Sequence, residues 1–155
     1  MHQSPDIVRR NGVPALARES RRLAGILLIL VPAVAFGGAS LLSMILGQSP
    51  GYLDNPLRQD LWRAGHAHAG VMLILALVLL RYVDETRLSG PWLWLGRHGV
   101  PLAAVLMPVG FFLSVLTPEA TSPNALIGLV FVGGLFLVGG VVAVGVGLLR
   151  GALPA

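Results

Sequence analysis

The chain has 155 residues, of which 55% are apolar and only 12% are charged, and it contains no cysteine. This composition excludes an ordinary soluble domain, and the lack of thiols excludes a disulfide framework, a thiolate metal site and a cysteine nucleophile. The formal net charge is +4, and all eleven basic residues are arginines. Most of them lie beside apolar runs, which indicates membrane topology and excludes a nucleic-acid partner.

The first 22 residues are polar and predict a basic cytoplasmic tail that ends on the lipid headgroups. Five arginines give the tail its charge: Arg9, Arg10, Arg18, Arg21 and Arg22. Residues 23–46 follow without a charge and, at about 1.5 Å per residue, are long enough to cross a bilayer. A twin-arginine signal is an alternative interpretation, but the apolar run continues beyond the length of a signal core. Small residues at four-residue spacing predict that one face of this span packs on another helix: Ala35, Ala39 and Ser43.

The second span is predicted over residues 64–83, at the end of a longer helix. Asn55 and Pro56 form a helix start, since Asn accepts hydrogen bonds from free backbone amides and Pro suits the first helical position. The charged turns before residue 64 must project into the headgroup layer, where Trp62 is placed as an interfacial anchor.

The third and fourth spans are predicted over residues 100–116 and 125–149. Arg97 and His98 lie just before the third span, where they are expected to contact lipid phosphate. In the fourth span, Gly139, Ala143 and Gly147 have the spacing that permits close contact between helices.

The predicted fold is therefore all-α: a four-transmembrane-helix bundle over residues 23–150. All arginines except Arg58 and Arg63 fall on the same side of the membrane as the tail. Because arginine-rich loops stay in the cytoplasm, we expect both termini to face the cytoplasm and the protein to lie in the cell membrane, in contact with its lipid.

Two histidines near the outer end of the second span, His66 and His68, are the strongest chemical signal in the sequence. Neutral imidazole is a common ligand for heme iron, copper and zinc. On a helix, however, residues two apart point to nearly opposite faces, so the pair cannot readily chelate one ion. Arg63 is placed to pair with a heme propionate or a lipid phosphate. Three interpretations of the pair stay open: metal or heme ligation, proton handling, and simple hydrogen bonding in the headgroup region.

The motif Arg63-Ala64-Gly65-His66-Ala67-His68, which leads into an apolar helix, resembles the His-x-His helix starts of heme-copper-oxidase-like membrane proteins. These include a family of heme- and copper-containing proteins linked to the nitric oxide response. The resemblance covers about fifteen residues, and it implies a heme or copper cofactor. In the oxidases, histidines on later helices complete the site. The third and fourth spans here bring no such histidine, so the resemblance implies at most a single cofactor, or a site completed by another copy or another subunit.

Three functions remain open on the sequence. The first is a redox or respiration-associated protein that binds heme or copper through the histidine pair. The second is a non-catalytic accessory or scaffold subunit that docks on a membrane-protein partner, and the third is a small-solute carrier that works as an oligomer. No nucleophile, base and orienting group recur at a recognisable spacing, and no phosphate-binding glycine loop follows a strand, so the sequence favours a protein that is not an enzyme.

Overall fold

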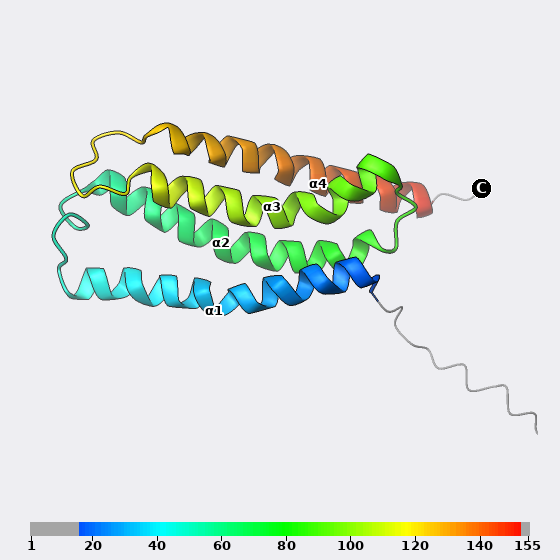
Figure 1. Cartoon of the computed structure of the whole chain (residues 1–155), viewed down its shortest axis with the longest axis horizontal. Coiled ribbons are helices and arrows are strands. Elements are labelled where there is room, and N and C mark those ends of the chain that lie inside the picture. The colour runs from blue at the N-terminus through cyan, green and yellow to red at the C-terminus, as the bar shows by residue number, and fades with distance from the viewer. Residues whose placement is uncertain (1–15, 153–155) are drawn as a thin grey trace, which may run out of the picture.

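The structure, a computed structural model, describes residues 16–152, and all regular secondary structure in this range is helical. Four long helices run side by side, as Figure 1 shows. They are α1 (Arg18–Leu46), α2 (Pro56–Val83), α3 (Gly90–Ser114) and α4 (Gly128–Ala152), with a short 3-10 turn, η2 (Ala125–Ile127), directly before α4. The predicted all-α architecture is confirmed, and the first helix begins at Arg18, within the segment that the sequence assigned to the tail.

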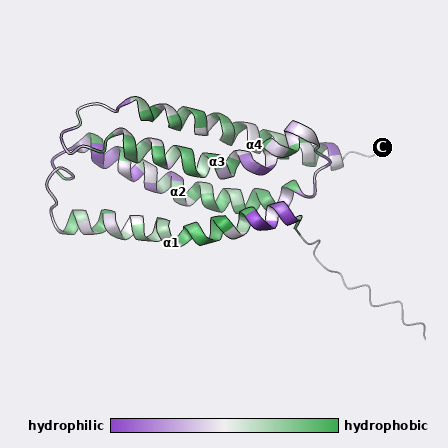
Figure 2. Cartoon of the chain, viewed as in Figure 1, coloured by the Kyte–Doolittle hydropathy of each residue, from purple (hydrophilic) through white to green (hydrophobic). Residues whose placement is uncertain are grey.

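Each of the four helices is long and apolar enough to span a membrane. Figure 2 shows hydrophobic residues along most of each helix and hydrophilic residues gathered toward the helix ends. Large apolar side chains point outward, and the side chains of Ile29, Phe36 and Leu135 are 75% exposed or more. Such a surface is unfavourable in water and favourable in hydrocarbon, which agrees with an integral membrane protein.

The second helix begins where the sequence predicts. The side chain of Asn55 accepts a hydrogen bond from the backbone amide of Arg58 at 3.1 Å, and Pro56 occupies the first helical position. The capping side chain satisfies an amide that would otherwise lack a partner. The same Asn55 donates to the carbonyl oxygens of Pro118 and Ala120, so it also ties the loop before α2 to the loop after α3.

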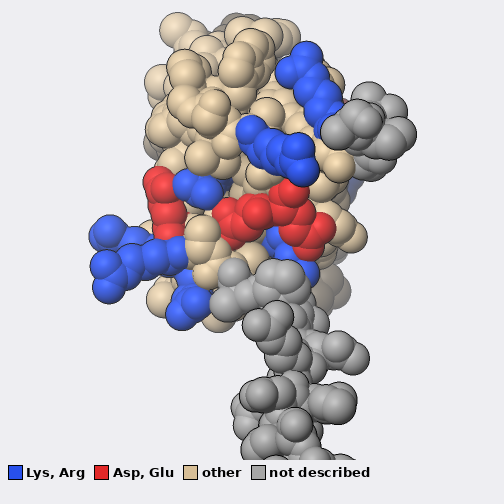
Figure 3. All heavy atoms as spheres, turned by 90° about the vertical axis from the view of Figure 1, so that its right-hand side faces the viewer, with Lys and Arg blue, Asp and Glu red and all other residues tan. Residues whose placement is uncertain are grey.

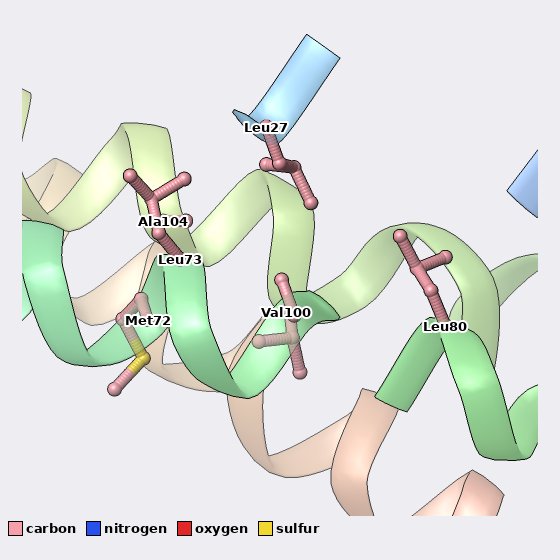
Figure 4. Close-up of a cluster of buried hydrophobic side chains, with 7 residues drawn as sticks. Leu27, Met72, Leu73, Leu80, Val100 and Ala104 are labelled. Atoms are coloured by element: carbon pink, nitrogen blue, oxygen red, sulfur yellow. The ribbon is translucent and has the colours of Figure 1, made fainter. Parts of the chain in front are cut away.

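Helix α3 lies between α2 and α4, whereas α1 packs mainly on α2 and barely touches α3. A buried apolar cluster joins the first three helices, as Figure 4 shows. Its members are Leu27 from α1, Met72, Leu73, Ala76 and Leu80 from α2, and Val100 and Ala104 from α3. The weak contact between α1 and α3 leaves room for a groove between these two helices.

A close backbone contact joins α3 and α4 through a pair of glycines, Gly99 and Gly140. A Cβ atom at Gly99 would lie 2.6 Å from the carbonyl oxygen of Phe136 and 2.9 Å from the Cα atom of Gly140. The predicted close contact of α4 is confirmed at its own residues as well. Ala143 is buried, and a Cβ atom at Gly139 would lie 3.1 Å from Leu95 of α3. Gly147 instead meets Leu88 in the loop before α3.

Within residues 16–152, the predicted packing face of the first span does not contact another helix. Ala35, Ala39 and Ser43 are exposed, and α1 instead turns Gly37 and Gly38 toward α2. The reason lies in the side chain that α2 presents: the imidazole ring of His66 needs more space than an alanine face would leave, and the two glycines provide it.

Candidate functional site

The imidazole ring of His66 packs against the backbone of α1. A Cβ atom built on Gly38 would lie 2.9 Å from Nε2 of His66, and one built on Gly37 would lie 3.8 Å from Nδ1. Both ring nitrogens therefore face α1 at short range. Within residues 16–152 neither ring nitrogen of His66 makes a hydrogen bond, so His66 meets α1 by packing alone.

An apolar groove of about 320 Å³ opens beside His66, between α1 and α3. Its floor comes from α2 and its walls come from the other two helices, including Val34 and Gly37 of α1 and Pro108 and Phe112 of α3. His66 itself lines this groove. Its ring nitrogens lie toward Gly37 and Gly38 of α1, and Gly37 lines the groove as well.

His68 is placed differently, although it is only two residues away. Its Nδ1 atom lies 2.7 Å from the carbonyl oxygen of Ala64, one helical turn earlier. A carbonyl oxygen can only accept, so Nδ1 must carry the proton and donate. In the neutral ring this leaves Nε2 with an unprotonated lone pair, which is the state that binds a metal ion or accepts a hydrogen bond.

The surroundings of His68 are apolar and open to lipid on one side. The ring lies 5.0 Å from the ring of Phe111 on α3, centroid to centroid. Together with Ala67, Val71 and Met72, the half-buried His68 lines a shallow hollow of about 160 Å³. Ala67 and Val71 are exposed, so the hollow faces away from the bundle.

The two histidines do not share a ligand within one chain. His66 is directed to α1 and His68 to Phe111 of α3, as expected from their spacing on a helix. In the part of the chain that the structure describes, no group of three His, Cys, Asp or Glu side chains is placed to hold one metal ion. A copper or zinc ion bound here would therefore have too few protein ligands for a closed site.

Arg63 lies on the exposed surface of α2. Its guanidinium group donates to the side-chain oxygen of Gln59 at 3.0 Å, one turn earlier. This contact leaves further N–H donors of the guanidinium group for an anion at the membrane surface.

Arg97 and His98 have partners that the sequence analysis missed, since it placed both residues against lipid phosphate. Nη2 of Arg97 donates to Asp84 at 3.0 Å, Nε donates to Ser20 at 3.1 Å, and the guanidinium group also pairs with Glu19. Nε2 of His98 lies 3.3 Å from Glu19. The expectation failed because α1 begins early enough to bring Glu19 and Ser20 onto α3.

This end of the molecule, the Arg97 end, is shown in Figure 3 with its acidic side chains lying among arginines. The side chains of Arg97 and Asp84 are only 12% and 13% exposed. Burial alone raises the pKa of Asp84, but the hydrogen bonds from the Ala17 amide, Ser20 and Arg97, with the charge of Arg97, outweigh it and hold the pKa below its usual value. The carboxylate is thus a charged anchor that joins α1, α2 and α3.

Arg58 fastens the loops at the opposite end, the Arg58 end. It donates to the carbonyl oxygens of Gly51 and Leu116, both at 2.9 Å, and its guanidinium carbon lies 4.1 Å from the centre of the Trp62 ring. Such contacts combine charge-assisted hydrogen bonds with a cation–π interaction. Arg58 therefore stabilises the loop before α2 and the loop after α3, and its guanidinium group interacts mainly with groups of the same chain.

The sequence matches no protein-family model, no curated protein and no solved structure. Function must therefore be inferred from the chemistry of the described residues. Of the three residues that the sequence singled out, His68 offers an available nitrogen, His66 is packed against α1, and Arg63 lies on the surface.

Proposed function

We propose that this protein is a multi-pass protein of the cell membrane with both termini in the cytoplasm. Four helices of spanning length support this proposal, because an even number of crossings would bring both ends of the bundle to one side of the membrane. Within residues 16–152, the Arg97 end holds seven of the nine arginines. Since positively charged loops stay on the cytoplasmic side, the Arg97 end is the cytoplasmic one.

We propose further that the protein binds heme, with Nε2 of His68 as the atom that would hold its iron. The observation that carries this proposal is the hydrogen bond from Nδ1 of His68 to Ala64 O at 2.7 Å. A histidine that binds a metal through one ring nitrogen usually donates a hydrogen bond from its other ring nitrogen. This bond fixes the tautomer and the orientation of the ring.

Heme suits the site better than a bare copper ion. The porphyrin ring supplies most of the ligands of its iron, so one or two imidazoles are enough to hold it, whereas copper needs a cluster of side chains. The apolar neighbours Ala67, Val71 and Phe111 are compatible with a flat apolar ring beside His68. A bound heme would supply one-electron redox chemistry, and the protein would supply ligation and an apolar surrounding.

The hollow at His68 is too shallow to bury a heme within one chain, since ligand pockets usually enclose about 300–1,000 Å³. We therefore propose that a second copy of the chain covers it. A two-fold axis beside α2 would bring the same residues from both copies to one site, so each copy would offer its own His68.

An absorption spectrum of the detergent-purified protein, expressed with added heme precursor, tests this function. The expected result is a Soret band with about one heme per two chains. His68→Ala should abolish the band. His66→Ala, a matched change two residues away, should leave most of it, because the nitrogens of His66 face α1. A wild-type protein without heme, or equal loss in both variants, would contradict the proposal.

A second candidate function is that of a non-catalytic accessory subunit. Gly134 and Gly145 of α4 meet nothing within 4 Å in the described part of the chain. They are eleven residues apart, about three helical turns, so they lie on one face of α4. At each of these glycines another transmembrane helix can approach the backbone of α4 closely. Copurification of a membrane-protein partner with a colourless protein would favour this function over heme binding.

A further inference from the structure

A hollow of about 300 Å³ lies at the Arg97 end, between α4 and the segment that leads into α3. Its lining divides into two parts of different character. Arg87, Ser89 and Arg150 supply polar groups at one part, whereas Trp92, Val142 and Val146 supply an apolar wall at the other. None of these residues belongs to the surroundings of His68.

Arg87 and Arg150 are exposed, and within residues 16–152 neither of them pairs with a carboxylate. The other arginine beside this segment, Arg81, is paired with Glu85. Two like charges that line one hollow repel each other, and an anion between them would remove that repulsion. The first turn of α3 adds to the attraction, because its N-cap residue Ser89 makes no side-chain capping bond and leaves backbone donors available.

The hollow is held in place by packing of the loop on α4. A Cβ atom at Gly147 would lie 2.9 Å from Cγ of Leu88 and 3.0 Å from Cβ of Thr86, so the loop rests directly on the helix. The hydroxyl of Thr86 donates to Val83 O at 2.7 Å, which fixes the turn after α2. The loop position of Arg87 is therefore set by its two neighbours, Thr86 and Leu88.

The apolar wall leads from the arginines into the membrane. Val142, Val146 and Arg150 are four residues apart and thus lie on one face of α4, along about 12 Å of helix. Val142 is 55% exposed and Trp92 is 63% exposed, so both are open to lipid. Tryptophan is also the residue that most often marks the level of the headgroups.

We propose that this hollow binds one anionic phospholipid. The phosphate lies between Arg87 and Arg150, and one acyl chain follows Val146 and Val142 toward the centre of the bilayer. An ion without an acyl chain would leave the apolar wall uncovered, which is why a lipid fits better than free phosphate. The site does not depend on heme binding.

Native mass spectrometry of the full chain in detergent tests the proposal, with phosphatidylglycerol, phosphatidylcholine or inorganic phosphate added in turn. Retention of phosphatidylglycerol alone is expected. The double variant Arg87→Gln, Arg150→Gln should lower its affinity roughly thirtyfold, which corresponds to about 2 kcal/mol. The double variant Arg18→Gln, Arg22→Gln removes the same charge at the same end and should change the affinity less than threefold, about 0.6 kcal/mol.

A third variant, Val146→Phe, keeps every charge but places a larger side chain in the hollow, where the acyl chain would lie. It should therefore weaken lipid retention as well. Circular dichroism of each variant should show the helix content of the wild type. An equal loss of phosphatidylglycerol affinity in the two double variants would show that only the net charge matters, and it would overturn the proposal. Equal retention of phosphatidylcholine, or binding of inorganic phosphate with the affinity of the lipid, would overturn it too.

Discussion

The carboxylate of Asp84, which directly follows α2, accepts a hydrogen bond of 3.0 Å from the guanidinium group of Arg97 on α3. The same carboxylate accepts from Ser20 at 2.9 Å and from the Ala17 amide at 2.7 Å. Apart from its contacts with α2, α1 has few ties to the rest of the bundle. The Asp84–Arg97 pair is therefore the polar centre to which the start of α1 is bound, through Ala17, Glu19 and Ser20.

Replacing Arg97 should weaken the fold considerably. Arg97→Gln leaves the largely buried Asp84 without its charged partner, and we expect the free energy of unfolding to fall by about 3 kcal/mol. Unfolding by a denaturing detergent, followed by circular dichroism, measures the change. Arg81→Gln is the matched control, because it breaks the exposed pair with Glu85 and should cost under about 1 kcal/mol. Equal effects of the two changes would show that Arg97 is no special anchor.

Stability should depend on acid through Asp84. Its pKa lies below the usual value in the folded protein, whereas in the unfolded chain it is about 3.9. The contribution of this group is therefore fully present above about pH 5 and is lost as the pH falls through the folded-state pKa. Unfolding measured between about pH 3 and pH 6 should show this loss in the wild type. Asp84→Asn should have a lower and flatter profile, and an unchanged acid dependence in that variant would assign the effect to other carboxyl groups.

The contact between α3 and α4 should not tolerate a methyl group at Gly99. Gly99→Ala would place a Cβ atom 2.6 Å from a backbone oxygen of α4, so the helices must separate, at a cost of about 1–3 kcal/mol. The same measurement on Gly25→Ala gives the control. A Cβ atom at Gly25 meets nothing within 4 Å, and alanine favours the helix by roughly 0.5–1 kcal/mol. A neutral Gly99→Ala would mean that α3 and α4 are farther apart than described.

The four spans could be predicted from the sequence because an apolar run of membrane length is a local property of the chain. The start of α2 was predictable for the same reason, since Asn55 and Pro56 act on the turn that follows them. The close contact of α4 was predictable because small residues at helical spacing mark a face. For α1 the same reasoning chose the wrong face, because small residues occur on several faces of this helix. The face that packs on α2 is the one with Gly37 and Gly38, which leave space for the ring of His66.

The partners of Arg97 could not be found from the sequence. They come from the start of α1 and from the turn after α2, and these segments meet only when the helices are packed. The one signal available was that Glu19, Asp84 and Arg97, which carry opposite charges, lie in segments that the predicted topology puts on the cytoplasmic side. The sequence predicts that His66 and His68 point to opposite faces of α2. It does not predict their neighbours, because Gly37 and Gly38 of α1 and Phe111 of α3 reach them only when the helices pack.

The central claim is that Nε2 of His68 is a heme ligand, and rescue by free imidazole tests it most directly. His68→Gly removes the side chain and should lose the Soret band, and imidazole added to the purified variant with heme should restore it. His66→Gly is the matched control and should keep most of the band without imidazole, because its ring nitrogens lie against Gly37 and Gly38. No Soret band in the wild type, or a His68→Gly protein that keeps its heme, would contradict the claim.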